Sequence, residues 1–61
     1  MTTFTTCTAE TYESIYERIY SLWSEDCEFD YAEAIAYAAE MDVIITEEEV
    51  AAICFDLACE A

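Results

Sequence analysis

Glycine, proline and histidine are all absent from this sequence of 61 residues, and Arg18 is its single basic residue. Turns that need a positive φ are disfavoured without glycine, and no proline interrupts a helix, so the composition favours helices joined by short polar segments. Without histidine the chain lacks the commonest general base and a frequent zinc ligand. With one basic side chain it also lacks the positive surface that binds nucleic-acid phosphates or anionic membranes.

The chain carries fifteen Asp and Glu residues, which gives a formal net charge of −14 at pH 7. Repulsion on this scale opposes a compact monomer, although it keeps the protein in solution. Direct binding to nucleic acid is therefore not expected. The charge instead favours a basic partner, such as a nucleic-acid-binding protein, a polycation or a metal ion.

Hydrophobic residues make up 57% of the chain and aromatic residues 15%, a composition typical of a folded protein. We predict an all-α fold: one compact three-helix domain over residues 1–61, with a short extended N-terminal arm. The first ten residues lack the basic region and the apolar run of a secretory signal. No stretch approaches the ~20 apolar residues of a membrane span, so a cytoplasmic location without membrane contact is expected.

The first helix is predicted over residues 9–24, with Thr8 as its N-cap. Its apolar residues recur at the spacing of one helical face and cover about 160° of the circumference. They are Tyr12, Ile15, Tyr16, Ile19, Tyr20, Leu22 and Trp23. Glu10, Glu13 and Glu17 fall on the opposite side, which predicts an exposed acidic stripe.

The second helix is predicted over residues 31–41, where Asp30 and Glu33 have the spacing of a capping box. Apart from Glu33 and Glu40, this helix is apolar around nearly its whole circumference and contains five alanines. A helix of this kind is usually buried on more than one side, so we predict that it lies between the other two.

The third helix is predicted over residues 47–60, with Thr46 and Glu49 as a second capping box. Its expected core face consists of Val50, Ile53, Cys54, Leu57 and Ala58. Glu49, Asp56 and Glu60 form an outer acidic stripe, and Phe55 belongs to neither face. Two interpretations of Phe55 stay open: the N-terminal arm covers it, or it is an exposed contact residue.

The sequence offers little for metal or redox chemistry. Its four cysteines contain no CxxC pair, and we interpret them as free, buried thiols. The alternative is a Cys7–Cys27 or Cys54–Cys59 disulfide. Asp26, Glu28 and Asp30 match the first, third and fifth ligands of an EF-hand, but tyrosines occupy the positions of its glycine and its bidentate glutamate. We therefore expect no dedicated metal site.

Catalytic chemistry is not expected either. The chain has no glycine-rich phosphate loop, and no Ser or Cys stands beside a plausible base. A domain this small also has little volume for a substrate cavity. The prediction is a protein that is not an enzyme, with no catalytic residues and no cofactor.

Residues 33–55 have the general shape of a helix-turn-helix, an alanine-rich helix followed by a short turn and a capped helix. A DNA-reading version would carry Lys, Arg, Asn or Gln where this chain has Glu47, Glu48, Glu49 and Ala52. The stretch AIAYAAEMDVIITEEEV also resembles the helical leader segments of certain precursor peptides, but the Gly-Gly processing site of those leaders is absent.

In size, acidity and helical build the chain resembles the small DNA-mimic inhibitors that phages and mobile elements encode against restriction enzymes, CRISPR effectors and other DNA-binding proteins. The resemblance implies a non-enzymatic inhibitor that occupies the basic nucleic-acid-binding surface of a target protein. Acidic side chains one helical turn apart lie ~5–6 Å from one another at Cβ and can imitate a row of phosphates. The predicted contact residues are Glu10, Glu13, Glu17, Glu25, Asp26, Glu28, Asp30, Glu33, Glu47, Glu48, Glu49, Phe55, Asp56 and Glu60.

A second hypothesis uses the same residues differently. The chain would be an acidic helical adaptor or oligomeric module whose partner does not bind nucleic acid. It could dimerise through the surface around Phe55 and Cys59, so a homodimer is a possible partner state.

Overall fold

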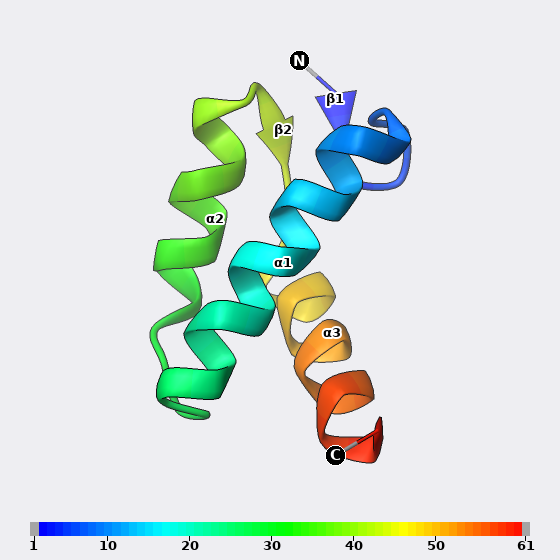
Figure 1. The fold of residues 1–61 in the computed structure, drawn as a ribbon. Helices are drawn as coiled ribbons and strands as arrows, with labels where there is room; N and C mark the ends of the chain where they lie inside the picture. The colour runs from blue at the N-terminus through cyan, green and yellow to red at the C-terminus, as the bar shows by residue number, and fades with distance from the viewer. Residues whose placement is uncertain (1, 61) are drawn as a thin grey trace.

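The structure is a computed structural model and describes residues 2–60. Its elements, in chain order, are β1 (Thr2–Thr3), α1 (Ala9–Glu25), α2 (Tyr31–Glu40), β2 (Val43–Ile44) and α3 (Glu47–Glu60). The radius of gyration is 10.7 Å, and a compact chain of this length is expected at about 10.5 Å. The all-α, three-helix fold predicted from the sequence is confirmed, and each pair of helices is in contact (Figure 1).

Each helix begins at the predicted cap. The Thr8 hydroxyl accepts a hydrogen bond from the Thr11 N–H at 3.2 Å, and the Asp30 carboxylate accepts one from the Ala32 N–H at 3.0 Å. At α3 the capping box is complete, because the Glu49 N–H donates to the Thr46 hydroxyl at 3.2 Å and the Thr46 N–H donates to the Glu49 carboxylate at 3.0 Å.

The predicted box at α2 is only half formed. Within residues 2–60 the Glu33 carboxylate receives no hydrogen bond from the Asp30 N–H, so Asp30 alone caps the helix. Glu33 still lies in the first turn, where the helix dipole favours a negative charge.

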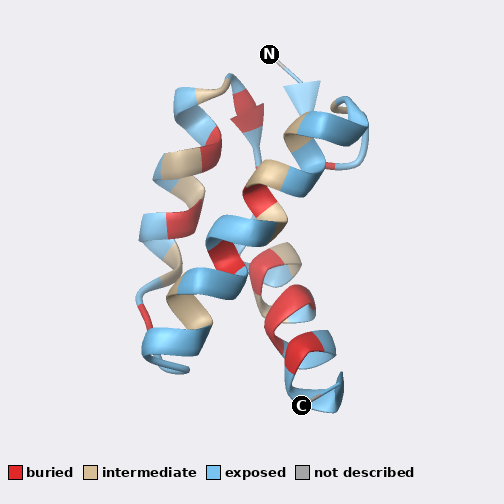
Figure 2. Cartoon of the chain, in the orientation of Figure 1, coloured by how far each residue is buried: buried red, intermediate tan, exposed pale blue. Residues whose placement is uncertain are grey.

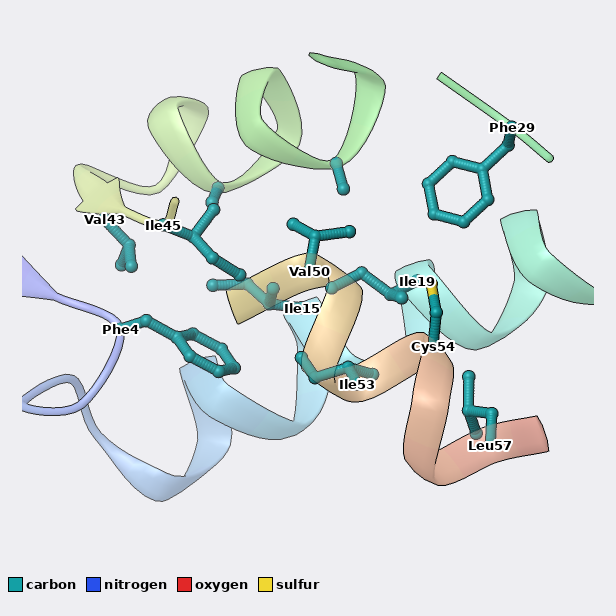
Figure 3. Packing of buried hydrophobic residues seen from close by; sticks show 12 residues of the cluster. Phe4, Ile15, Ile19, Phe29, Val43, Ile45, Val50, Ile53, Cys54 and Leu57 are labelled. Atoms are coloured by element: carbon teal, nitrogen blue, oxygen red, sulfur yellow. The ribbon is translucent and has the colours of Figure 1, made fainter. Parts of the chain in front are cut away.

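The core is formed where the three helices and β2 meet, as Figure 3 shows. Ile15 and Ile19 of α1 and Val50 of α3 are its largest fully buried side chains. No polar or charged residue among residues 2–60 is buried, so the core is held by apolar contact alone. Figure 2 shows the buried residues on the inward faces of the helices and exposed residues around the outside.

The predicted central position of α2 is wrong. Only Ala34 and Ala38 of this helix are buried, whereas α3 contributes four buried residues. Ala32, Ala36 and Ala39 are exposed, as is Ala58 of α3, which we had assigned to the core face. Alanine buries little area and is the best helix former, so an alanine on a helix face does not by itself predict that the face is buried.

The N-terminal arm does not cover Phe55. It pairs with β2 as a two-residue parallel ladder, with Thr2 opposite Val43 and Thr3 opposite Ile44. The Phe4 N–H extends this ladder by donating to the Ile44 carbonyl at 2.9 Å, and the Phe4 side chain enters the core. The arm is therefore part of the folded domain.

One turn uses a positive φ in spite of the missing glycine. Asp42, between α2 and β2, has φ 60°, and its N–H donates to the Ala39 carbonyl at 3.0 Å. Asp and Asn visit this left-handed region more readily than other side chains. The absence of glycine therefore did not exclude such a turn, and an aspartate takes the place that glycine would have filled.

Candidate interaction surface

The acidic residues lie almost entirely on the outside of the molecule. Of the fifteen Asp and Glu side chains, fourteen are exposed, and Glu49 is half-buried because it closes the cap of α3. The formal charge of −14 is therefore presented to solvent. Arg18 lies with its guanidinium carbon 5.6 Å from the centre of the Tyr37 ring, so the one basic side chain contacts an aromatic face.

The structure brings the predicted α1 acids together. Glu10, Glu13 and Glu17 line one open hollow on the outer side of α1, together with the side chain of Met41. Their spacing of three and four residues places them along one side of the helix, as the sequence predicts.

A second group forms where the loop after α1 approaches the start of α3. Glu28 and Asp30 from the loop line an open hollow with Glu47 from α3. The loop itself is shaped by its acids, because the Asp26 carboxylate accepts a hydrogen bond from the Glu28 N–H at 3.0 Å. Asp26 and Asp30 thus have local structural roles, which sequence reasoning assigned only to Asp30.

The predicted outer stripe of α3, Glu49, Asp56 and Glu60, does not form one continuous acidic group. Glu49 is bonded to Thr46 at the start of the helix, whereas Asp56 and Glu60 belong to its last turns, where Glu60 lines a hollow with Tyr20 and Trp23 of α1. Partial burial raises the pKa of the Tyr16 hydroxyl, and the negative charges of Glu60 and Asp56 raise it further. The last two turns of α3 therefore place carboxylates next to an aromatic surface of α1.

This aromatic surface was not predicted from the sequence. Tyr12 and Tyr20 were assigned to the core face of α1, yet they are 41% and 52% exposed. With Tyr16 they line a hollow of about 480 Å³ that is open to solvent and edged by Glu13 and Glu17. We call this hollow the tyrosine groove. The apolar stripe of α1 is ~160° wide, and α2 and α3 together do not cover all of it. This width was the one feature of the sequence that could have predicted exposed tyrosines.

The remaining predicted contact residues are dispersed. Phe55 is 69% exposed on α3, in agreement with the interpretation that it is uncovered. Glu25 ends α1, Glu33 lies in the first turn of α2, and Glu48 follows Glu47 in the first turn of α3. The structure leaves open which of these acids contact a partner, and their binding role stays a prediction.

The four cysteines are free thiols, but the prediction that all are buried is wrong. Only Cys54 is buried, Cys7 is half-buried, and Cys27 and Cys59 are exposed. Among residues 2–60 no three Asp, Glu or Cys side chains are grouped so that they could hold a metal ion.

Thiol labelling should separate these cysteines. Burial raises the pKa of the Cys54 thiol, although a hydrogen bond with Tyr31 partly offsets this. A disulfide reagent at pH 8 is expected to label Cys27 and Cys59 at once and Cys54 at least ~100-fold more slowly, since Cys54 must wait for the domain to open. A Cys54→Ala variant is the control for the labelling experiment. It should lose the slow phase alone, and one common rate for all thiols would contradict the structure.

The raised pKa of Cys54 also predicts a pH dependence of stability. Because folding holds this thiol neutral, its contribution to stability should fall as the pH rises above its unfolded pKa of about 8.5.

Among residues 2–60, each helix is too short or too polar to cross a bilayer. The chain matches no family model, no curated protein and no solved structure.

Proposed function

We propose that the protein is a non-enzymatic inhibitor that occupies the basic nucleic-acid-binding surface of a target protein, using its carboxylates in place of phosphates. The observation that carries this proposal is the exposed, uncompensated charge: −14 in total, with fourteen of the fifteen acids exposed. An ordinary helical surface mixes Glu with Lys, and each such pair stabilises a helix by a few tenths of a kcal/mol. This chain forgoes that stabilisation almost completely.

The arrangement of the acids supports the same proposal. Eight of the fifteen gather in three places: Glu10, Glu13 and Glu17 on α1, Glu28 and Asp30 with Glu47, and Asp56 and Glu60 at the end of α3. Within a helix, carboxylates one turn apart stand ~5–6 Å apart at Cβ, and phosphates repeat every ~3.4 Å of axis along a strand, so an acidic helical stripe can imitate a row of phosphates. A surface of this kind attracts a basic groove at long range and should give fast, salt-sensitive association.

One observation favours the second candidate, an acidic adaptor. Phe55 is the most exposed large apolar side chain of the described residues, at 69%. An adaptor would use it as an anchor on the partner, whereas a phosphate mimic depends on the carboxylates around it. The two functions therefore differ in which variants lose the partner.

The test is capture of a partner by the tagged protein from a nuclease-treated lysate of the organism that encodes it. A nucleic-acid-binding protein should be retained at low salt, released at high salt and displaced by added duplex DNA. Two variants are compared. Replacement of Glu13, Glu17, Glu47 and Glu48 by glutamine reduces the negative net charge from −14 to −10 and should weaken capture strongly, while Phe55→Ala should weaken it much less. Capture that survives both salt and DNA, and is lost with Phe55→Ala, would contradict mimicry and favour the adaptor.

A further inference from the structure

The tyrosine groove combines partly exposed aromatic rings with carboxylates at its edge. Tyr12 and Tyr16 stack with ring centres 6.4 Å apart, and the buried Phe4 supports Tyr12 from the arm at 4.4 Å. Tyr20 continues the row toward a second hollow, which it lines with Trp23, Leu57 and Glu60. The row is therefore held in place by the packed core, and about half of the surface of Tyr12 and Tyr20 remains accessible.

Carboxylates stand on both sides of this row. Glu13 and Glu17 edge the groove on the outer side of α1. Helix geometry places the tyrosines between these glutamates and the buried Ile15 and Ile19, which is the side where α3 packs. On the α3 side, Glu60 lines the second hollow with Tyr20 and Trp23, and the negative charges of Glu60 and Asp56 raise the pKa of the Tyr16 hydroxyl. The one basic residue of the chain, Arg18, is held elsewhere, over Tyr37.

We infer that the tyrosine groove is the docking site for an arginine-bearing segment of the basic partner. This inference rests on the proposed function and names the surface and the side chain through which the partner binds. A guanidinium is planar and weakly hydrated, so it can lie on a tyrosine ring while its N–H groups donate to carboxylates. Lysine offers the same charge without the planar stacking. The contact between Arg18 and Tyr37 shows the same chemistry within this chain.

Charge complementarity excludes the other occupants. A second copy of the chain would bring another −14 to the groove. Nucleic acid would be repelled for the same reason, and an apolar peptide would leave Glu13, Glu17 and Glu60 without a counter-charge. A segment with several arginines satisfies both the rings and the carboxylates.

The test uses octa-arginine and octa-lysine as probes of equal charge, with affinities measured by calorimetry at 0.05 M NaCl. Octa-arginine should bind more tightly, by at most roughly 5- to 30-fold, which is the factor for two exposed cation–π contacts that arginine makes and lysine does not. In backbone amide NMR spectra it should shift residues 12–20 and 56–60 more than residues 46–49. In Tyr12→Leu/Tyr20→Leu, which removes the two exposed rings of the groove, the preference for arginine should disappear, and octa-lysine should lose less affinity than octa-arginine. Phe55→Leu, which changes an exposed aromatic residue outside the groove, should keep the preference.

Circular dichroism shows whether the double variant folds. If it does not, Tyr20→Leu alone serves, because this side chain is 52% exposed, and it should lower the preference by roughly 2- to 5-fold, one contact of the two. Equal affinity for both peptides, or a preference that survives the leucine substitutions, would overturn the docking site and leave the proposed function standing. Failure of both peptides to bind at low salt would overturn both.

Discussion

Replacing Phe4 by alanine is expected to remove most of the stability of this domain. Phe4 is 5% exposed, lies in the core cluster with β2 and α1, and stacks on Tyr12. Removing a buried phenylalanine side chain costs about 3–5 kcal/mol. A chain of this length has roughly 3–9 kcal/mol in total at 0.05–0.15 kcal/mol per residue. Urea unfolding at constant salt, followed by far-UV circular dichroism, should show a fully or largely unfolded variant.

The chain contains a matched control for this prediction. Phe55→Ala is the same chemical change at a side chain that is 69% exposed, and it should alter the free energy of unfolding by at most about 0.5 kcal/mol. Phe4→Leu keeps most of the buried volume and should cost less than about 1.5 kcal/mol. A cost below 1 kcal/mol for Phe4→Ala would show that the arm does not pack into the core. A large cost for Phe55→Ala would show that something covers that ring.

The helices were predictable because their signals are local. The apolar spacing of α1 and the caps at Thr8, Asp30 and Thr46 all lie within a few residues of the ends they specify. The predicted ends agree with the structure to within one residue, with α1 reaching Glu25 and α2 ending at Glu40.

The arm was only half predictable for the opposite reason. Its pairing joins Thr2 to Val43, some forty residues away, over two residues on each strand. Such short strands have no alternating pattern to read, and nothing in TTFTT distinguishes a strand from a loose arm. The apolar Phe4 was the one available clue, and one of the two interpretations of Phe55 placed the arm over that residue instead.

The acidic residues of the candidate site were predicted from the sequence, but its exposed tyrosines were not. Acids are almost never buried without a partner, so placing them on the surface needed no structure. Whether Tyr12 and Tyr20 are covered depends on how much of α1 the other helices reach, which sequence periodicity does not specify. Tyrosine suits a partly exposed position because its ring is apolar and its hydroxyl is polar.

Salt should stabilise this protein strongly. The molecule measures 31 × 20 × 17 Å, and the Debye length is about 30 Å at 0.01 M salt and about 10 Å at 0.1 M. At 0.01 M every acid therefore repels every other across the whole domain, while at 0.1 M only neighbours such as Glu13 and Glu17 still interact. Each close like-charged helix pair costs ~0.2–0.5 kcal/mol, so relief of several pairs and of the longer-range repulsion is on the order of 2 kcal/mol.

For a domain of this size, that change raises the midpoint of thermal unfolding by about 8–16 °C between 0.01 and 0.5 M NaCl. Thermal scans followed by circular dichroism measure it. The control is the variant with Glu13, Glu17, Glu47 and Glu48 changed to glutamine, whose net charge of −10 should make the midpoint less dependent on salt. A midpoint that is flat across this range would mean that the exposed carboxylates do not oppose folding.

The salt dependence of folding has the opposite sign to that of binding, and this links stability to the proposed function. Salt stabilises the free protein because it screens the acids from one another. It weakens the binding of a basic partner because it screens the acids from that partner. A bound partner supplies the counter-charge that salt otherwise provides. The partner should therefore raise the unfolding midpoint more at 0.01 M than at 0.3 M NaCl, when both are compared at saturation. An adaptor held through Phe55 should give the same increase at both concentrations, because apolar contact is little affected by screening.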